Sequence, residues 1–275
     1  MAAVTSAPVE GDWSDRAEEL LGEMLRADQA PEHGLDGASG QPTGRLYMMA
    51  QPVDAVEDVA LALTQSLDQL AFIQFVRAGI QGIDRQSTAM VELSYVLHRS
   101  PTADGVALRS DPVESHEHED LRVDVEMRED GGLRLLAGGL FRNLEGSGNL
   151  NSGVNTQITD GQPNPSVNPS ALIGYTHCFL NWAAAVGASL GYTGTWIFGV
   201  RLTGTKGARA AIPGPRHLSF QRNLNPYPNA SYSKNVTATA ERLAEERSAI
   251  AYMLIGRYLR SLDVDHLHPE LLTHS

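Results

Sequence analysis

Two alternating segments joined by a glycine turn limit the fold of this chain more than any other feature. Residues 121–128 alternate apolar and charged side chains, Asp130, Gly131 and Gly132 form a turn signal, and a second apolar run follows at 133–140. This pattern predicts an antiparallel β-hairpin. Because charged residues recur at every second position, we expect the hairpin to belong to a sheet with one buried face and one wet face.

Helix and strand signals on both sides of the hairpin complete an α+β pattern. Apolar periodicity predicts helices at 13–27, 56–80 with a break near Ser66, 171–190 and 236–262. Runs of β-forming residues predict further strands at 45–53, 88–98, 106–109 and 195–203. Gly191 stands where a C-terminal cap should end the third helix. The order predicts a mostly antiparallel sheet with helices packed on one face, in a single main domain.

Segments without periodicity divide the chain. We expect an N-terminal helix and linker at 1–42, a core at 43–265 with long loops at 143–170 and 211–235, and a polar tail at 266–275. The first of these loops is expected to be disordered or to contact a partner. The separate N-terminal helix can pack on a neighbouring element, on a partner chain or on the distant core, and it is a candidate docking element. In that case, removal of residues 1–42 leaves the core folded and abolishes association.

The composition excludes several classes of protein. The 275 residues have a formal net charge of −12, which disfavours a uniform attraction to nucleic acid or to anionic membranes. Cys178 is the single cysteine, so an internal disulfide and a thiolate metal cage are excluded. The N-terminus has no signal-peptide pattern, and no apolar run approaches the length of a membrane span. We therefore expect a cytoplasmic protein without membrane contact.

The charge is unevenly distributed. Residues 201–260 hold ten Lys or Arg and three Asp or Glu, a charge of +7. Such a region indicates a surface for an anion or an acidic partner, or arginines that pair with the protein's own acidic strands. Interleaved aromatic residues also fit a groove for single-stranded nucleic acid. The candidate binding residues are Arg201, Lys206, Arg209, Arg216, Arg222, Tyr232 and Lys234.

Two other motifs have residues that could carry chemistry. Gly199 and Gly204 have the spacing of a phosphate-binding loop, but Thr205 occupies the lysine position, so turn glycines are favoured. His116 and His118 would lie on one face of a strand, as a metal site requires. An acidic solvated loop is favoured over a metal centre there. We assign no catalytic residue and expect no cofactor.

A family resemblance rests on short motifs in the second half of the chain. They are the hairpin at 121–141, Trp196-Ile197-Phe198-Gly199-Val200, Thr203-Gly204, Gly207-Ala208 and Ile255-Gly256-Arg257-Tyr258-Leu259-Arg260. Residues 45–262 resemble the C-terminal region of actinobacterial proteins whose N-terminal part is a Schlafen AlbA-type domain, a class associated with ATP or nucleic-acid binding. The AlbA-type segment itself is not found in this chain. The resemblance implies a companion module and transfers no catalytic residues.

Three functional hypotheses follow. The first is a non-catalytic binding or assembly module that acts with a protein partner or as a homo-oligomer. The alternative is a nucleic-acid-binding accessory protein that uses the basic 201–260 face. The third is a metal-dependent enzyme around His116 and His118.

Overall fold

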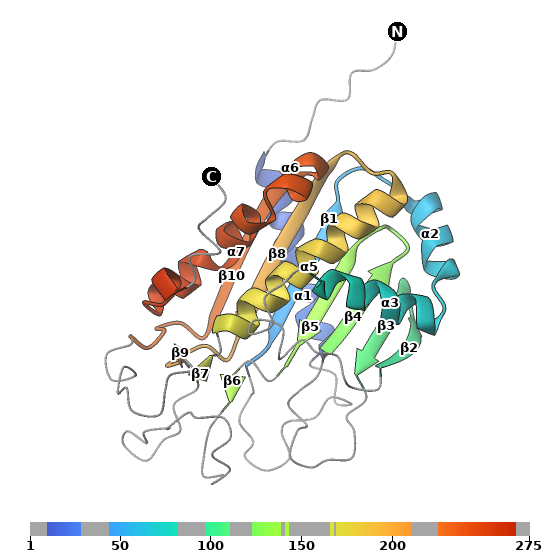
Figure 1. Cartoon of the computed structure of the whole chain (residues 1–275). Helices are drawn as coiled ribbons and strands as arrows, with labels where there is room; N and C mark the ends of the chain where they lie inside the picture. The colour runs from blue at the N-terminus through green and yellow to red at the C-terminus, as the bar shows by residue number, and fades with distance from the viewer. Residues whose placement is uncertain are drawn as a thin grey trace.

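The computed structural model describes residues 10–28, 44–81, 97–110, 123–138, 141–142, 166–167, 169–210 and 225–267. They form one main body around an open, seven-stranded antiparallel sheet (Figure 1). From one edge to the other, its strands are β10 (Ser231–Thr239), β8 (Thr195–Thr203), β1 (Leu46–Pro52), β5 (Leu133–Ala137), β4 (Val123–Arg128), β3 (Gly105–Ser110) and β2 (Leu97–Thr102). The predicted α+β fold is confirmed.

Most helices cover one face of this sheet. They are α2 (Glu57–Ser66), α3 (Gln69–Ile80), α5 (Pro169–Leu190), α6 (Ala240–Glu245) and α7 (Arg247–Ser261), followed by the short 3-10 helix η4 (Asp265–Leu267). The predicted break near Ser66 is confirmed, because α2 ends at that residue and Asp68 caps α3 by accepting a hydrogen bond from the Ala71 amide at 2.8 Å.

The long helix α5 is the centre of this layer. It is apolar on nearly all sides because it packs on the sheet and is flanked by α3 and α7 in the same layer. The indole of Trp182 is fully buried and donates a hydrogen bond to the Val76 carbonyl of α3 at 2.9 Å. Gly191 ends α5 with a φ of +62°, as its predicted capping role requires.

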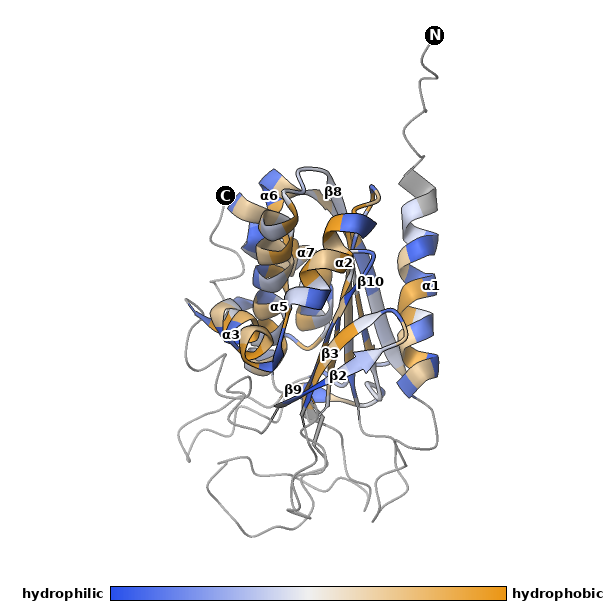
Figure 2. Cartoon of the chain, turned by 90° about the vertical axis from the view of Figure 1, so that its right-hand side faces the viewer, coloured by the Kyte–Doolittle hydropathy of each residue, from blue (hydrophilic) through white to orange (hydrophobic). Residues whose placement is uncertain are grey.

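Helix α1 (Glu10–Asp28) packs on the opposite face of the sheet (Figure 2). Its buried side chains are Ala17, Leu20, Leu21 and Met24, and they form a second apolar cluster with Tyr47, Met49 and Ile197. Gly199 of β8 allows this close approach, since a Cβ there would lie 3.0 Å from Leu21 Cδ1. The helix that we considered as a docking element is therefore part of the protein's own core.

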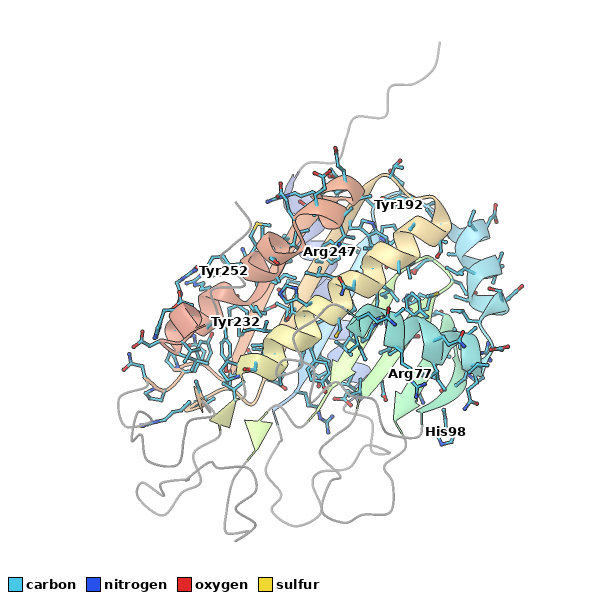
Figure 3. The ribbon with its side chains drawn as sticks, viewed as in Figure 1. Arg77, His98, Tyr192, Tyr232, Arg247 and Tyr252 are labelled. Carbon is cyan, nitrogen blue, oxygen red and sulfur yellow. The ribbon has the colours of Figure 1, made fainter. Side chains whose placement is uncertain are left out.

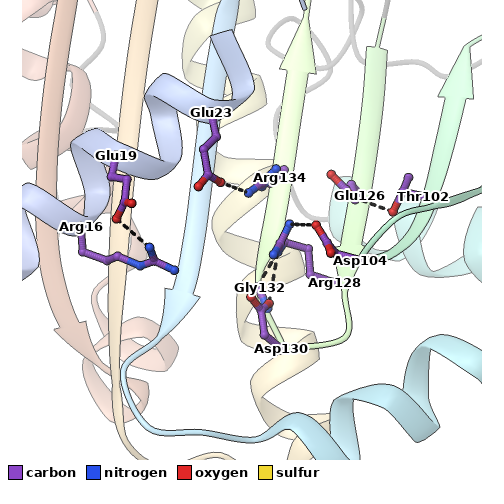
Figure 4. Close-up of polar contacts among 10 residues, drawn as sticks. All are labelled: Arg16, Glu19, Glu23, Thr102, Asp104, Glu126, Arg128, Asp130, Gly132 and Arg134. Atoms are coloured by element: carbon purple, nitrogen blue, oxygen red, sulfur yellow. Dashed lines mark hydrogen bonds and ion pairs between the residues drawn. The ribbon is translucent and has the colours of Figure 1, made fainter. Parts of the chain in front are cut away.

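The predicted hairpin is present as β4 and β5. Val123 pairs with Ala137 and Met127 with Leu133, and the buried residues alternate with partly exposed ones on both strands. In the turn, the Gly132 amide donates to the Asp130 carboxylate at 2.9 Å (Figure 4). Arg128 forms ion pairs with Asp130 and Asp104, both at 3.2 Å, which tie this turn to the β2–β3 turn.

The end of the chain differs from the prediction. Residues 231–235 were expected in a loop and 236–239 in a helix, but all of them belong to β10. The strand is polar because it is an outer strand of the sheet, so it lacks the apolar alternation that reveals an inner strand. The predicted final helix is also divided at Glu246 into α6 and α7.

A small second sheet lies at one end of the body. It pairs β6 (Phe141–Arg142) with β7 (Ser166–Val167) and β7 in parallel with β9 (Arg209–Ala210). Most of the predicted loop at 143–170 and of the predicted strand at 88–98 lies outside the described residues. Among the helices that the structure describes, none alone is long and apolar enough to cross a membrane, and only α2 and α3 together, bent by 108°, meet that test.

Candidate functional site

The outer edge of β10 presents a row of backbone groups that the sheet does not use. The Ala240 amide donates to the Gly194 carbonyl at 2.9 Å, in the same register as the β10–β8 ladder. In an antiparallel pair, the residues that bond across the ladder alternate with residues whose N–H and C=O point away. The N–H and C=O groups of the even-numbered residues of β10 therefore point toward β8. The outward residues are Ser231, Ser233, Asn235, Thr237 and Thr239.

The opposite edge of the sheet is less suited to pairing. The Glu129 amide donates to the Asp104 carbonyl at 2.8 Å. This bond shows which residues of β3 direct their backbone N–H and C=O toward β4, and hence which residues of β2 direct theirs toward β3. The outward residues of β2 then include Pro101, which has no N–H to donate. Proline at such a position is a known protection of sheet edges. β10 has nine residues against six in β2, and it contains no proline.

The two faces beside the β10 edge carry opposite charge. On one face, the Ser233 hydroxyl donates to the Glu18 carboxylate of α1 at 2.6 Å, and the side-chain amide of Asn235 donates to the Ser14 hydroxyl at 3.1 Å. α1 contains seven Asp or Glu and two Arg. On the other face, the Tyr232 phenol donates to the Leu254 carbonyl of α7 at 2.6 Å. α7 contains three arginines and no acidic residue.

Arginines of α7 act on the edge strand itself. Burial raises the pKa of Tyr232 to about 12, and the positive charges of Arg257 and Arg260 oppose this rise. The charges of Arg257 and Arg260 therefore act on a side chain of β10. Arg260 also stacks on the ring of Tyr252, 5.1 Å from its centroid, and donates to its hydroxyl. Arg257 is exposed, as is Lys234 on β10.

The ring of Tyr232 belongs to an aromatic cluster that anchors the strand to α7. The ring centroids of Tyr232 and Tyr258 lie 5.4 Å apart, and those of Tyr227 and Tyr258 lie 4.8 Å apart. Figure 3 shows Tyr232 beside α7, with Tyr252 and Arg247 on that helix. The ring of Tyr232 is buried and has a structural role in this cluster, and its predicted role as a contact for a ligand stays a prediction.

Those predicted binding residues that the structure describes do not share one surface. Arg201 is turned toward α1, where it pairs with Glu18, while Tyr232 faces α7. Lys206 is exposed in the turn after β8, and Arg209 lies in the small sheet. Arg216 and Arg222 lie outside the described residues, as do His116 and His118. Arg201 does pair with an acidic residue of the protein itself, but this residue belongs to helix α1 and not to an acidic strand, as the alternative had it.

No group of three or more His, Cys, Asp or Glu that could hold a metal ion occurs in the described part of the chain. Cys178 is fully buried in α5, and burial raises the pKa of its thiol to about 12. A thiol in this environment is a core residue, not a nucleophile at neutral pH.

A polar hollow of about 150 Å³ lies beside the C-terminal end of α1. Two of its charged lining residues are engaged by neighbours: Arg134 pairs with Glu23 at 2.9 Å, and Glu126 accepts a hydrogen bond from Thr102 at 2.7 Å (Figure 4).

Two residues that line this hollow, Asp28 and Tyr47, help to fix α1 to the sheet. The Tyr47 phenol donates to Asp28 at 2.6 Å, and Arg45 binds the same carboxylate. Burial and the bond to Asp28 raise the pKa of Tyr47. The hollow and this triad form a seam that holds α1 on the sheet. The sequence pattern gave no signal for them, because it does not place α1 on this face.

The edge assignment makes a direct prediction for the isolated protein. The amide protons of Ser233, Asn235 and Thr237 are expected to exchange with solvent at least ~100-fold faster than those of Lys234 and Val236, which bond to β8. Residue-resolved hydrogen exchange of ¹⁵N-labelled protein measures this difference. Equal protection of all five amides would mean that the outer edge is already covered.

Comparisons with protein-family models, with curated proteins and with solved structures found no match to this chain.

Proposed function

We propose that this protein is a non-catalytic interaction module that binds an extended segment of a partner protein by strand addition at the outer edge of β10. The observation that carries this proposal is the row of outward backbone groups on a nine-residue outer strand without proline. Strand addition uses such groups for affinity and flanking side chains for specificity. The role fits the companion module that the family resemblance implies.

A partner segment is favoured over a second copy of this chain. In Figure 1, α7 crosses β10 obliquely and its C-terminal end projects past the strand. A symmetric pair of β10 strands would bring two α7 helices together above the same edge. Each helix carries Arg247, Arg257 and Arg260 without an acidic residue, so the two would repel each other. A single extended segment brings no second helix.

Thr237 offers a substitution that blocks the edge without breaking the sheet. Its amide points outward, its side chain is exposed, and Thr237→Pro removes one outward donor while the bonds to β8 remain. We expect peptides of about ten residues, selected from a displayed random library on the wild-type protein, to bind Thr237→Pro at least ~10-fold more weakly. Fluorescence anisotropy with each purified peptide measures this loss.

Thr237→Ala is the matched control, since it removes the same side chain and keeps the amide. It is expected to bind the selected peptides like the wild type. If the peptides bind the proline and alanine variants equally well, strand addition at β10 is wrong. Circular dichroism of both variants verifies that the proline variant is folded.

A further inference from the structure

We infer that the segment bound at β10 alternates acidic side chains with basic or small polar ones, so that its acidic side chains face α7. This inference rests on the proposed strand addition and adds the chemistry of the partner. It depends on the charges on the two sides of the edge and on the alternation of side chains along a strand.

A strand added at β10 directs successive side chains to opposite faces of the sheet. One set lies on the side of α7, next to the exposed cations Lys234 and Arg257. The other set lies on the side of α1, where Glu18 and Ser14 contact β10. Glu18 also pairs with Arg201, but α1 as a whole is acidic, with seven Asp or Glu against two Arg. The β10 edge is therefore flanked by a basic wall, made of Lys234 and the arginines of α7, and by an acidic wall, made of α1.

Opposite charges on the two walls select a segment by the order of its charged residues and not by its net charge. Acidic side chains at every second position meet the basic wall, while the intervening residues avoid repulsion only if they are basic or neutral. A segment with acidic residues in an unbroken block places half of them against α1. Such a block is rejected by like-charge repulsion.

The test compares two peptides of about ten residues with the same composition. In one, Glu and Lys alternate; in the other, all Glu residues precede all Lys residues. We expect the alternating peptide to bind at least ~10-fold more tightly at low ionic strength, with a difference that shrinks as salt is added. Equal affinity of the two peptides would overturn the inference.

Charge reversal identifies the wall that is responsible. Arg257→Glu is expected to weaken binding of the alternating peptide about 10-fold. Arg77→Glu is the matched control: Arg77 is an exposed arginine on α3, away from β10 (Figure 3), and its reversal changes the net charge by the same amount. Equal effects of the two variants would show that only the net charge matters and would overturn the inference.

The failure of this inference and the failure of strand addition give different results. If library-selected peptides slow the exchange of the outward β10 amides but show no preference for alternation, strand addition stands and the charge pattern is wrong. If no peptide slows their exchange, both are wrong. An oligothymidylate that binds in place of the peptides, sensitive to Arg257→Glu but not to Thr237→Pro, would assign the surface to single-stranded nucleic acid instead and overturn the inference.

Discussion

Removal of residues 1–42 is expected to unfold or aggregate the protein, although the sequence pattern suggested that the core would survive. Four side chains of α1 are buried on the sheet, and the three large ones, Leu20, Leu21 and Met24, each contribute about 1.5–3 kcal/mol. Their loss approaches the whole stability of an average domain, about 5–15 kcal/mol. The truncation also leaves Arg45, Arg134 and Arg201 without the carboxylates of α1.

A point substitution tests the same claim in the full chain. Leu21 is fully buried against Met49 and Gly199, so Leu21→Ala is expected to lower the free energy of unfolding by about 2–5 kcal/mol. Glu19→Ala on the exposed side of α1 removes only an ion pair with Arg16 at 2.7 Å and should change the free energy of unfolding by less than ~0.5 kcal/mol. Urea unfolding measures both. A Leu21→Ala variant as stable as Glu19→Ala would mean that α1 does not pack on this sheet in solution.

Substitution of Gly79 is expected to have the second large effect. A Cβ at this position would lie 2.1 Å from both Cδ1 and Nε1 of Trp182, so even alanine forces the buried indole to move. The movement breaks its hydrogen bond to Val76 and disturbs the bond that Asn181 donates to the Gly79 carbonyl at 2.8 Å. Overpacking and an unsatisfied buried donor each cost about 1–3 kcal/mol.

We therefore expect Gly79→Ala to destabilise the protein by about 3 kcal/mol or more, which corresponds to a fall in Tm of roughly 6–12 °C for a chain of this size. Gln74→Ala, at an exposed position of the same helix, serves as the control. Differential scanning fluorimetry is sufficient for the comparison. If the two variants melt within about 1 °C of each other, the contact between α3 and α5 is not as tight as described.

The fold was predictable where a long pattern repeats. Apolar and charged side chains alternate over both strands of the β4–β5 hairpin, and α5 is apolar over 22 residues, so the sequence alone predicts both elements. β10 was missed because an outer strand with both sides partly exposed needs no alternation. The position of α1 was left open, since an amphipathic helix fits any apolar surface.

The candidate site was predictable only in part. Lys234 was identified from the excess of basic residues at 201–260, and it does lie at the β10 edge. Arg201, from the same region, lies on the other face and is paired with Glu18. The acidic wall comes from α1, more than two hundred residues earlier in the chain. No local pattern reveals which amides of a strand point outward, because this depends on its pairing partner.

The most direct test of strand addition at β10 is hydrogen exchange of the ¹⁵N-labelled protein with a saturating library-selected peptide. We predict that the amides of Ser233, Asn235 and Thr237 become at least ~10-fold slower, while those of Lys234 and Val236 change little. Protection that alternates along β10 in this way is the signature of an added strand. Protection confined to other elements, with the outward β10 amides still exchanging rapidly, would contradict the account.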